Sequence, residues 1–123
     1  MINTSILSGL SNGNRTDLFN NKVTNADAVL LLLSANGGKS KTRDLRQALR
    51  TWSNSSKSFG YLFQNYEPGW STGYGFVGRS FEQATTEIDG PYPYNRRNFY
   101  YRTQRGTVAI SAEGFRRLAE IKF

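Results

Sequence analysis

The chain of 123 residues contains neither cysteine nor histidine, and each absence excludes a class of site. Without cysteine there is no disulfide framework and no thiolate zinc site. Without histidine the chain lacks the commonest general base and metal ligand, along with every catalytic triad that contains it. Apolar runs stay well below the ~18 residues that a membrane helix needs. The N-terminus lacks the basic start and apolar core of a secretory signal, so we expect a cytoplasmic protein with no membrane partner.

Acidic residues are few and scattered, with nine Asp and Glu against 16 Lys and Arg. No pair of carboxylates has the spacing expected of shared acid–base or metal chemistry. One enzymatic alternative is a nuclease built from the charged residues Arg79, Glu82, Glu87 and Asp89. The composition favours a protein that is not an enzyme and that holds no metal or other cofactor.

A second enzymatic alternative is a nucleotide hydrolase, raised by the stretch VLLLLSANGGKSKTRDL at residues 29–45. A phosphate-binding loop requires a glycine five positions before Gly38, so that backbone amides can wrap around the phosphates. This chain has Leu33 at that position. A magnesium site would also need a carboxylate after a second apolar strand, and Asp89, the nearest approach, belongs to a largely polar segment. We therefore interpret Gly37-Gly38 as a helix stop.

The net charge of +7 and the pI near 10 indicate a polyanionic partner. Residues 39–57 carry six Lys and Arg against Asp44 alone, and residues 91–123 carry seven against two Glu. The intervening block, residues 67–90, carries Arg79 against four acidic residues. Folding could bring the two basic blocks onto one face, although a solvated surface is the simpler interpretation for any single arginine.

Residues 1–23 are rich in Asn, Ser and Gly, which predicts a flexible N-terminal arm or loosely packed extension before a single domain at 24–123. Thr24 is a good helix cap, and Asp27 suits the positive end of the helix dipole. The helix would run to about Ala35 and end at the following Asn-Gly-Gly. A short buried strand fits the four leucines almost as well by periodicity, and only the caps favour the helix.

A second helix is predicted from an apolar stripe at i, i+3, i+4 and i+7 spacing, made of Leu45, Ala48, Leu49 and Trp52. Ser40 or Thr42 can cap this helix. Its opposite face carries Arg43, Gln47 and Arg50.

The same spacing recurs in a predicted third helix at 53–66, with Ser53 or Asn54 as the cap. Its apolar stripe is Phe59, Leu62, Phe63 and Tyr66. The other face carries residue types that contact bases and phosphates, namely Asn54, Lys57, Ser58, Tyr61 and Gln64. A short connection between the second and third helices makes a helix-turn-helix. The alternative is an ordinary small helical core with polar outer faces.

A β-hairpin is predicted in NFYYRTQRGTVAIS, residues 98–111, with a two-residue turn at Arg105-Gly106. This turn sets Gln104 opposite Thr107, Thr103 opposite Val108 and Tyr101 opposite Ile110. We expect the buried side to carry Phe99, Tyr101, Val108 and Ile110. The exposed side would then carry Tyr100, Arg102 and Gln104.

A closing helix follows the hairpin. Ser111 can cap it, and Glu113 suits its first turn. Its apolar stripe would be Phe115, Leu118 and Ala119.

Two segments resemble winged helix-turn-helix DNA-binding domains. YYRTQRGTVAISAEGFRRLAEI is similar to the wing strands and final helix, and GGKSKTRDLRQAL is similar to the entry into the second helix. The resemblance implies an α+β fold in which three N-terminal helices precede a hairpin wing and a C-terminal helix. It also implies that the third helix, with Asn54, Lys57, Ser58, Tyr61 and Gln64, enters the major groove.

The resemblance assigns the remaining basic residues to the nucleic-acid backbone. Arg102 and Arg105 of the wing would touch phosphates or the minor groove. Lys39, Lys41 and Arg43 would grip phosphates at the start of the second helix, where free amides also favour anions.

Residues 67–98 form an insertion longer than a winged helix needs before its wing. They hold all three prolines and include Tyr74–Phe81 as a strand-pair segment. A connection this long is usually functional or disordered, and we expect a partner surface, an enlarged wing or a clamp. The acidity of residues 82–89 argues against nucleic-acid contact there.

Three functions follow from these features. The favoured one is a duplex DNA-binding regulator of transcription that reads the major groove. The second is a single-strand binder whose aromatic side chains stack on bases, namely Trp70, Tyr74, Tyr92, Tyr94 and Tyr100. The third is a protein-docking module of a phage or mobile-element assembly, acting in the host cytoplasm. Any homodimer interface would come from residues 1–23 or 67–98.

Overall fold

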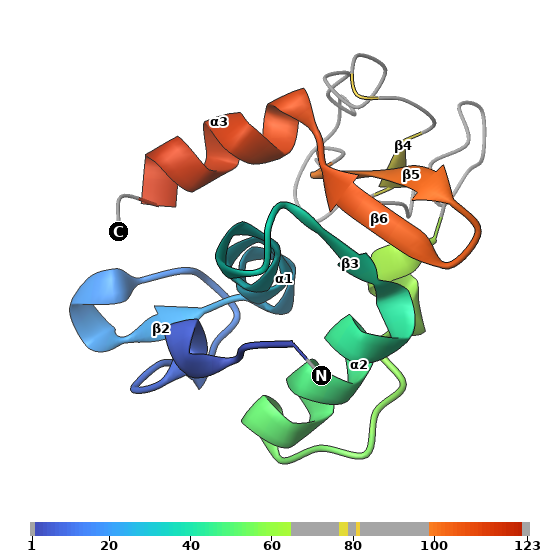
Figure 1. Cartoon of the computed structure of the whole chain (residues 1–123). Helices are drawn as coiled ribbons and strands as arrows, with labels where there is room; N and C mark the ends of the chain where they lie inside the picture. The colour runs from blue at the N-terminus through green and yellow to red at the C-terminus, as the bar shows by residue number, and fades with distance from the viewer. Residues whose placement is uncertain (1, 65–76, 79–80, 82–98, 122–123) are drawn as a thin grey trace, which may run out of the picture.

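The computed structural model describes residues 2–64, 77–78, 81 and 99–121. Within these ranges, three α-helices and a four-stranded sheet make an α+β fold (Figure 1). The helices are α1 (Asn25–Ala35), α2 (Thr42–Ser53) and α3 (Ala112–Ile121). The sheet has the order β3-β6-β5-β4, with β3 Lys39–Lys41, β6 Thr107–Ile110, β5 Tyr100–Gln104 and β4 Val77–Gly78. Within the described ranges, no helix is long and apolar enough to cross a membrane.

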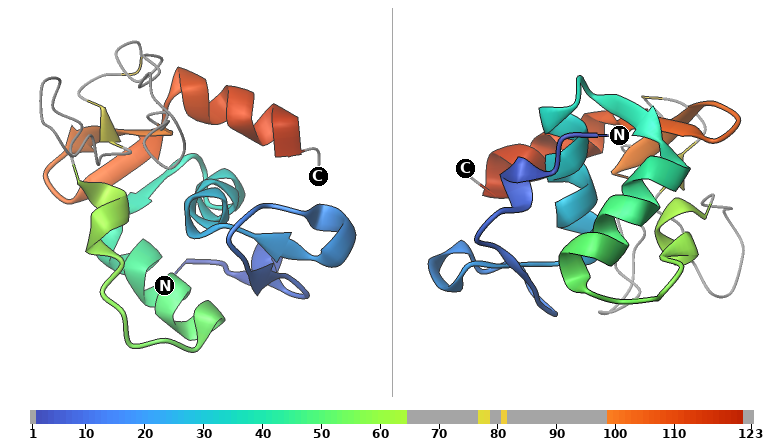
Figure 2. Two further views of the ribbon diagram at one scale, coloured as in Figure 1. Left: turned by 180° about the vertical axis from the view of Figure 1, so that it is seen from behind. Right: turned by 60° about the horizontal axis from the view of Figure 1, so that its bottom comes forward.

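Helix α1 is the centre of the core, as its run of leucines requires. Thr24 caps it by accepting a hydrogen bond from the Asp27 amide at 3.2 Å, and residues 27–33 are all buried. The helix ends where Gly37 and Gly38 adopt φ values of 85° and 89°, a left-handed conformation that glycine adopts without strain. The predicted helix, cap and stop are therefore confirmed. Seen from behind, α1 again lies between the N-terminal segment and the sheet (Figure 2).

The N-terminal segment is packed against this core, so the predicted loose arm is wrong for residues 2–23. It contains η1 (Ser5–Leu7), β1 (Ser11–Asn12), η2 (Leu18–Asn20) and β2 (Lys22–Val23). Leu7 and Val23 are buried in the core, and β1 pairs with β2 in parallel. The Trp52 indole of α2 donates a hydrogen bond to the Leu10 carbonyl at 2.8 Å. A few well-placed apolar side chains are enough to fix this polar segment.

Helix α2 buries Leu45, Ala48 and Leu49, while Trp52 is half-buried, so the predicted stripe is confirmed. The predicted caps are wrong, because the N-cap is Lys41 and its side chain makes no capping hydrogen bond. The cause is the preceding strand β3, which the sequence did not reveal. This strand pairs antiparallel with β6 and carries the chain directly into the helix.

The hairpin forms at Arg105-Gly106, with Gly106 at φ 76° and Gln104 opposite Thr107 as predicted. Beyond that pair the register differs, because Arg102 lies opposite Val108 and Tyr101 opposite Ala109. Thr103 is the extra residue of a β-bulge, which shifts every preceding side chain by one position. Tyr100 is therefore fully buried and Tyr101 is half-buried, the reverse of the prediction, whereas Phe99, Val108 and Ile110 are buried as expected.

The predicted third helix is wrong over residues 53–64. Ser53 is the last residue of α2, and Asn54 is its C-cap with φ 51°. A connection leads to a single 3-10 turn, η3 (Gly60–Phe63), preceded by Phe59 at φ 57°. Asn tolerates this left-handed conformation, and the Ser55 and Ser58 hydroxyls accept hydrogen bonds from the Lys57 and Gly60 amides, which competes with helix formation. Residues 65 and 66 lie outside the described part of the chain.

Helix α3 is capped by Ser111, whose hydroxyl accepts a hydrogen bond from the Gly114 amide at 3.0 Å, as predicted. Its rotation differs from the expected stripe. Glu113, Gly114 and Ile121 are buried and Leu118 is half-buried, whereas Phe115 is 54% exposed and Ala119 is exposed. Gly114 faces the core because only a residue without a side chain fits against Phe99.

The insertion at 67–98 lies outside the described residues except at two places. Val77 and Gly78, inside the expected strand-pair segment, form β4 parallel to β5. Phe81 lies edge-on to Tyr101, with ring centroids 5.9 Å apart. The proposed nuclease residues Arg79, Glu82, Glu87 and Asp89 are outside the described part.

Candidate nucleic-acid interface

Four of the expected phosphate-binding side chains lie along one edge of the fold, and we call them the basic ridge: Lys39, Lys41, Arg43 and Arg105. The Thr42 amide donates a hydrogen bond to the Gly106 carbonyl at 2.9 Å, which joins the start of α2 to the hairpin turn. Strand pairing places Lys41 opposite Thr107 and Lys39 opposite Ala109. The two basic blocks of the sequence therefore meet where β3, α2 and the hairpin converge (Figure 1).

All four ridge side chains are exposed. Within the described part of the chain, Arg43 is the one member with an ion-pair partner, and its Nε lies 3.7 Å from the Asp44 carboxylate. The Arg43 side chain is 77% exposed, so water and salt screen this pair and leave its attraction weak. Among the described residues, the ridge thus presents three charges without an ion-pair partner and one weakly paired charge to solvent. Such an arrangement attracts polyanions.

Arg102 does not join the ridge, although it was expected to touch nucleic acid. It is half-buried, and its guanidinium donates a hydrogen bond to the Phe63 carbonyl at 3.0 Å. The bulge at Thr103 explains the difference, because it turns Arg102 to the same side of the sheet as Val108. Arg102 therefore fixes η3 to the sheet.

The residues expected to read bases are exposed but do not lie on the ridge. Asn54 and Arg43 are at opposite ends of α2, which separates them by about 17 Å at the usual rise per residue. Ser58 is held beside α2, because its carbonyl accepts a hydrogen bond from Arg46 Nε at 2.7 Å. Lys57 precedes it in the same connection.

The end of this segment turns toward the sheet. The Tyr61 hydroxyl accepts a hydrogen bond from the Asn25 amide group at 3.0 Å. Gln64 approaches β4, since its carbonyl accepts a bond from the Val77 amide at 3.4 Å. These residues do not share the one helical face that the sequence predicted.

Tyr100 is buried and is not a stacking surface, which corrects its expected role in single-strand binding. Its hydroxyl donates a hydrogen bond to the Ala26 carbonyl at 2.7 Å, and its ring lies 6.1 Å from that of Phe63. Burial raises the pKa of Tyr100 well above its usual 10.0, and the charges of Asp27 and Tyr61 add to this effect. The other proposed stacking residues, Trp70, Tyr74, Tyr92 and Tyr94, lie outside the described ranges.

We expect Tyr100→Phe to lower the free energy of unfolding at neutral pH by about 1 kcal/mol, because it removes one buried hydrogen bond. Above pH 10 the unfolded wild type loses the Tyr100 proton while the folded wild type keeps it, so its stability falls as pH rises. The variant lacks this loss, and the two stabilities should converge. Urea unfolding of both proteins from about pH 8 to about pH 11 measures their free energies of unfolding. A difference between wild type and variant that stays constant with pH would contradict the prediction.

The strand β3 is the part of the ridge that sequence analysis missed, although it identified both lysines. Lys39 and Lys41 are exposed and Ser40 is half-buried, an alternation typical of an edge strand. Three residues are too few for such a pattern to be recognised in the sequence. The backbone bond from Thr42 to Gly106, which aligns the ridge, leaves no sequence signal.

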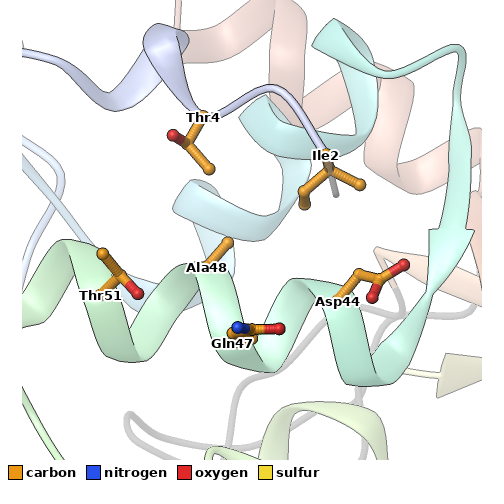
Figure 3. Close-up of a pocket in the computed structure, with 6 residues that line it drawn as sticks. All are labelled: Ile2, Thr4, Asp44, Gln47, Ala48 and Thr51. Carbon is orange, nitrogen blue, oxygen red and sulfur yellow. The ribbon is translucent and has the colours of Figure 1, made fainter.

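A small cleft lies beside the ridge, between the N-terminal segment and α2. Its volume is about 130 Å³, and Figure 3 shows its lining of Ile2, Thr4, Asp44, Gln47, Ala48 and Thr51. Ligand pockets usually enclose roughly 300–1,000 Å³, which is more than the volume of this cleft.

Metal ligands do not gather around the ridge in the part of the chain that the structure describes. Among the residues that the structure describes, no three acidic side chains approach one another closely enough to hold a metal ion. What the described residues of the ridge offer is exposed positive charge. Compared with known protein families, with curated proteins and with solved structures, the chain matches none of them.

Proposed function

We propose that this protein binds nucleic acid, with duplex DNA as the favoured ligand, through a winged-helix-like α+β domain. The observation that carries the proposal is the basic ridge. Two basic blocks, residues 39–57 and 91–123, contribute to it, and a backbone hydrogen bond of 2.9 Å between Thr42 and Gly106 aligns them. Such a line of exposed cations suits the phosphate backbone, which supplies most of the affinity in non-specific binding.

The order of elements supports the winged-helix comparison. The strand before the second helix, β3, pairs with the second hairpin strand, β6. This pairing brings the hairpin turn beside the N-terminus of α2. In the proposed complex the turn, with Arg105, acts as the wing, and α2 with β3 holds Lys39, Lys41 and Arg43 against the same backbone. A role in transcription regulation remains part of this proposal.

We expect Lys41→Ala/Arg105→Ala to weaken duplex binding at least about tenfold at low salt. The variant makes fewer phosphate contacts and therefore releases fewer counterions from the DNA when it binds. The slope of log K against log salt should become shallower by about 2. Fluorescence anisotropy with a labelled 20-bp duplex at several salt concentrations measures both quantities. Circular dichroism checks that the fold is intact.

The matched control is Arg15→Ala/Lys22→Ala, which removes the same charge from exposed positions. Strand β2, which contains Lys22, lies on the opposite side of the molecule from the hairpin (Figure 1). The control should bind nearly as the wild type does. Equal losses of affinity in the two variants would mean that net charge, and not the ridge, governs binding. Absence of wild-type binding at low salt would overturn the proposed function.

The second candidate function is docking to an acidic protein surface. It is favoured by the replacement of the expected third helix with η3, because a winged-helix-like fold without that helix loses its usual groove-reading element. The same titration separates the two functions, since a docking module would bind neither duplex nor single-stranded DNA. Competition between the two forms of DNA then tests the single-strand alternative.

A further inference from the structure

We infer that the basic ridge recognises the phosphate backbone of a duplex without discriminating between base sequences. This inference rests on the proposed nucleic-acid binding and specifies its ligand. It differs from the expectation of a sequence-reading third helix, which would have made the protein specific for an operator. Three features of the described residues carry it.

The first feature is the position of η3, which follows α2 where a reading helix would be expected. Four residues of 3-10 helix span only about 8 Å, whereas the reading element of a helix-turn-helix is a whole helix that lies in the major groove. Leu62 and Phe63 are buried in the core, and the Phe63 carbonyl is bound to Arg102. The turn is held against the protein and does not project from it.

The second feature is the connection before η3. Its two ends are fixed by Asn54 at φ 51° and by Phe59, which is buried at φ 57°. Arg46 binds the Ser58 carbonyl between them and draws the chain along α2. The side chains of Asn54 and Lys57 consequently project from a loop, where the geometry of a bidentate base contact is harder to maintain than on a helix.

The third feature is the chemistry of the ridge. Lys39 and Lys41 are separated by about 6.6 Å along β3, close to the distance between neighbouring phosphates in one strand. Lysine is a flexible point charge whose ammonium group accepts many orientations of its partner. Arg43 and Arg105 continue the row at the helix start and the hairpin turn. A row of this kind positions a protein on a backbone and carries no direct information about the bases.

The experiment uses the full chain and a random 20-bp duplex library, selected over several rounds and sequenced, together with titrations of an AT-rich and a GC-rich duplex. We expect no enriched motif, dissociation constants within tenfold of each other, and a salt slope of about −3 to −4 for four ridge contacts. An enriched motif bound more than tenfold tighter would overturn the inference while leaving the proposed function intact. Failure to bind any duplex would overturn the proposed function itself.

Two variants locate the contacts. Lys41→Ala/Arg105→Ala should weaken binding to the AT-rich and GC-rich duplexes by the same factor. Asn54→Ala/Gln64→Ala removes two exposed amide groups that could pair with adenine, without altering charge. It should leave the ratio of the two dissociation constants unchanged, and a change in that ratio greater than about threefold would place base contacts in the 54–64 segment and contradict the inference.

Discussion

Replacing Gly114 by alanine should destabilise the protein by about 3 kcal/mol or more, at the upper end of the usual overpacking effect. A Cβ atom at this position would lie 2.2 Å from the Phe99 carbonyl oxygen and 2.9 Å from Ile110 Cγ2. These distances are far shorter than any real contact of a Cβ atom. Helix α3 would therefore have to move away from the sheet.

The surrounding structure cannot yield easily to such a Cβ atom. The Phe99 carbonyl is fixed, because it accepts a hydrogen bond from the Ser111 amide at 3.0 Å. The Gly114 amide in turn binds the Ser111 hydroxyl at 3.0 Å, so a shift of α3 also disturbs its cap. Gly114 thus takes part in the helix cap and also packs directly against the Phe99 carbonyl.

Urea unfolding followed by circular dichroism measures the effect on the free energy of unfolding. The control is Gly60→Ala, whose Cβ would meet only the Ser58 hydroxyl oxygen, at an ordinary 3.7 Å. The control should change stability by less than about 1 kcal/mol. Comparable losses in the two variants would show that alanine is disfavoured for backbone reasons and not by the contact with Phe99.

The elements that the sequence predicted well are those fixed by local signals. Thr24 and Ser111 are polar caps at the start of apolar periods, and Arg105-Gly106 is a turn that needs a positive φ at glycine. Each signal acts within a few residues, so it survives whatever the rest of the chain does. The ridge lysines and arginines could be identified because charge is visible in the sequence.

The prediction of a third helix was wrong because an apolar spacing does not specify the type of helix. Phe59, Leu62 and Phe63 are buried as their spacing predicted, but in a 3-10 turn preceded by a left-handed residue. A 3-10 helix also places residues i and i+3 on one side, so a short apolar period cannot distinguish it from an α-helix. The burial was therefore predictable and the conformation was not.

The other errors depend on contacts between distant segments. Because of the bulge at Thr103, Tyr100 is buried and Arg102 donates a hydrogen bond to the Phe63 carbonyl. No local sequence feature indicates such an extra residue in a strand. The burial of Leu7 against α1 likewise depends on the tertiary fold. The charges of the interface were thus visible in the sequence, whereas their separation from the 54–64 segment was not.

Asp27 connects three segments, and its replacement by alanine should destabilise the protein by about 3–4 kcal/mol. Its carboxylate is 1% exposed and accepts two hydrogen bonds from Arg117 of α3, at 2.9 Å from Nε and 2.7 Å from the terminal nitrogen. The Thr16 hydroxyl donates to the same carboxylate. The hydrogen bond to Asp27 and its charge raise the pKa of Arg117, so the guanidinium stays charged at any working pH.

The expected loss of stability in Asp27→Ala arises mainly from Arg117, which is left without its partner. Without Asp27, the partly buried guanidinium keeps its charge but loses its bidentate partner, and α3 loses its link to the start of α1. Glu120, the other partner of Arg117, is 47% exposed and cannot compensate fully. Urea unfolding of Asp27→Ala measures the loss, and a value below about 1 kcal/mol would contradict a structural role for the pair.

Two further variants separate the ion pair from general surface effects. Glu120→Gln removes the exposed partner of the same arginine and should change stability by less than about 1 kcal/mol. Asp27→Ala/Arg117→Met removes both charges of the pair, so it should recover much of the stability lost in Asp27→Ala, because no unpaired charge is left. A double variant as unstable as the sum of its single variants would show that the two residues act independently, and α3 would then be held by its apolar contacts alone.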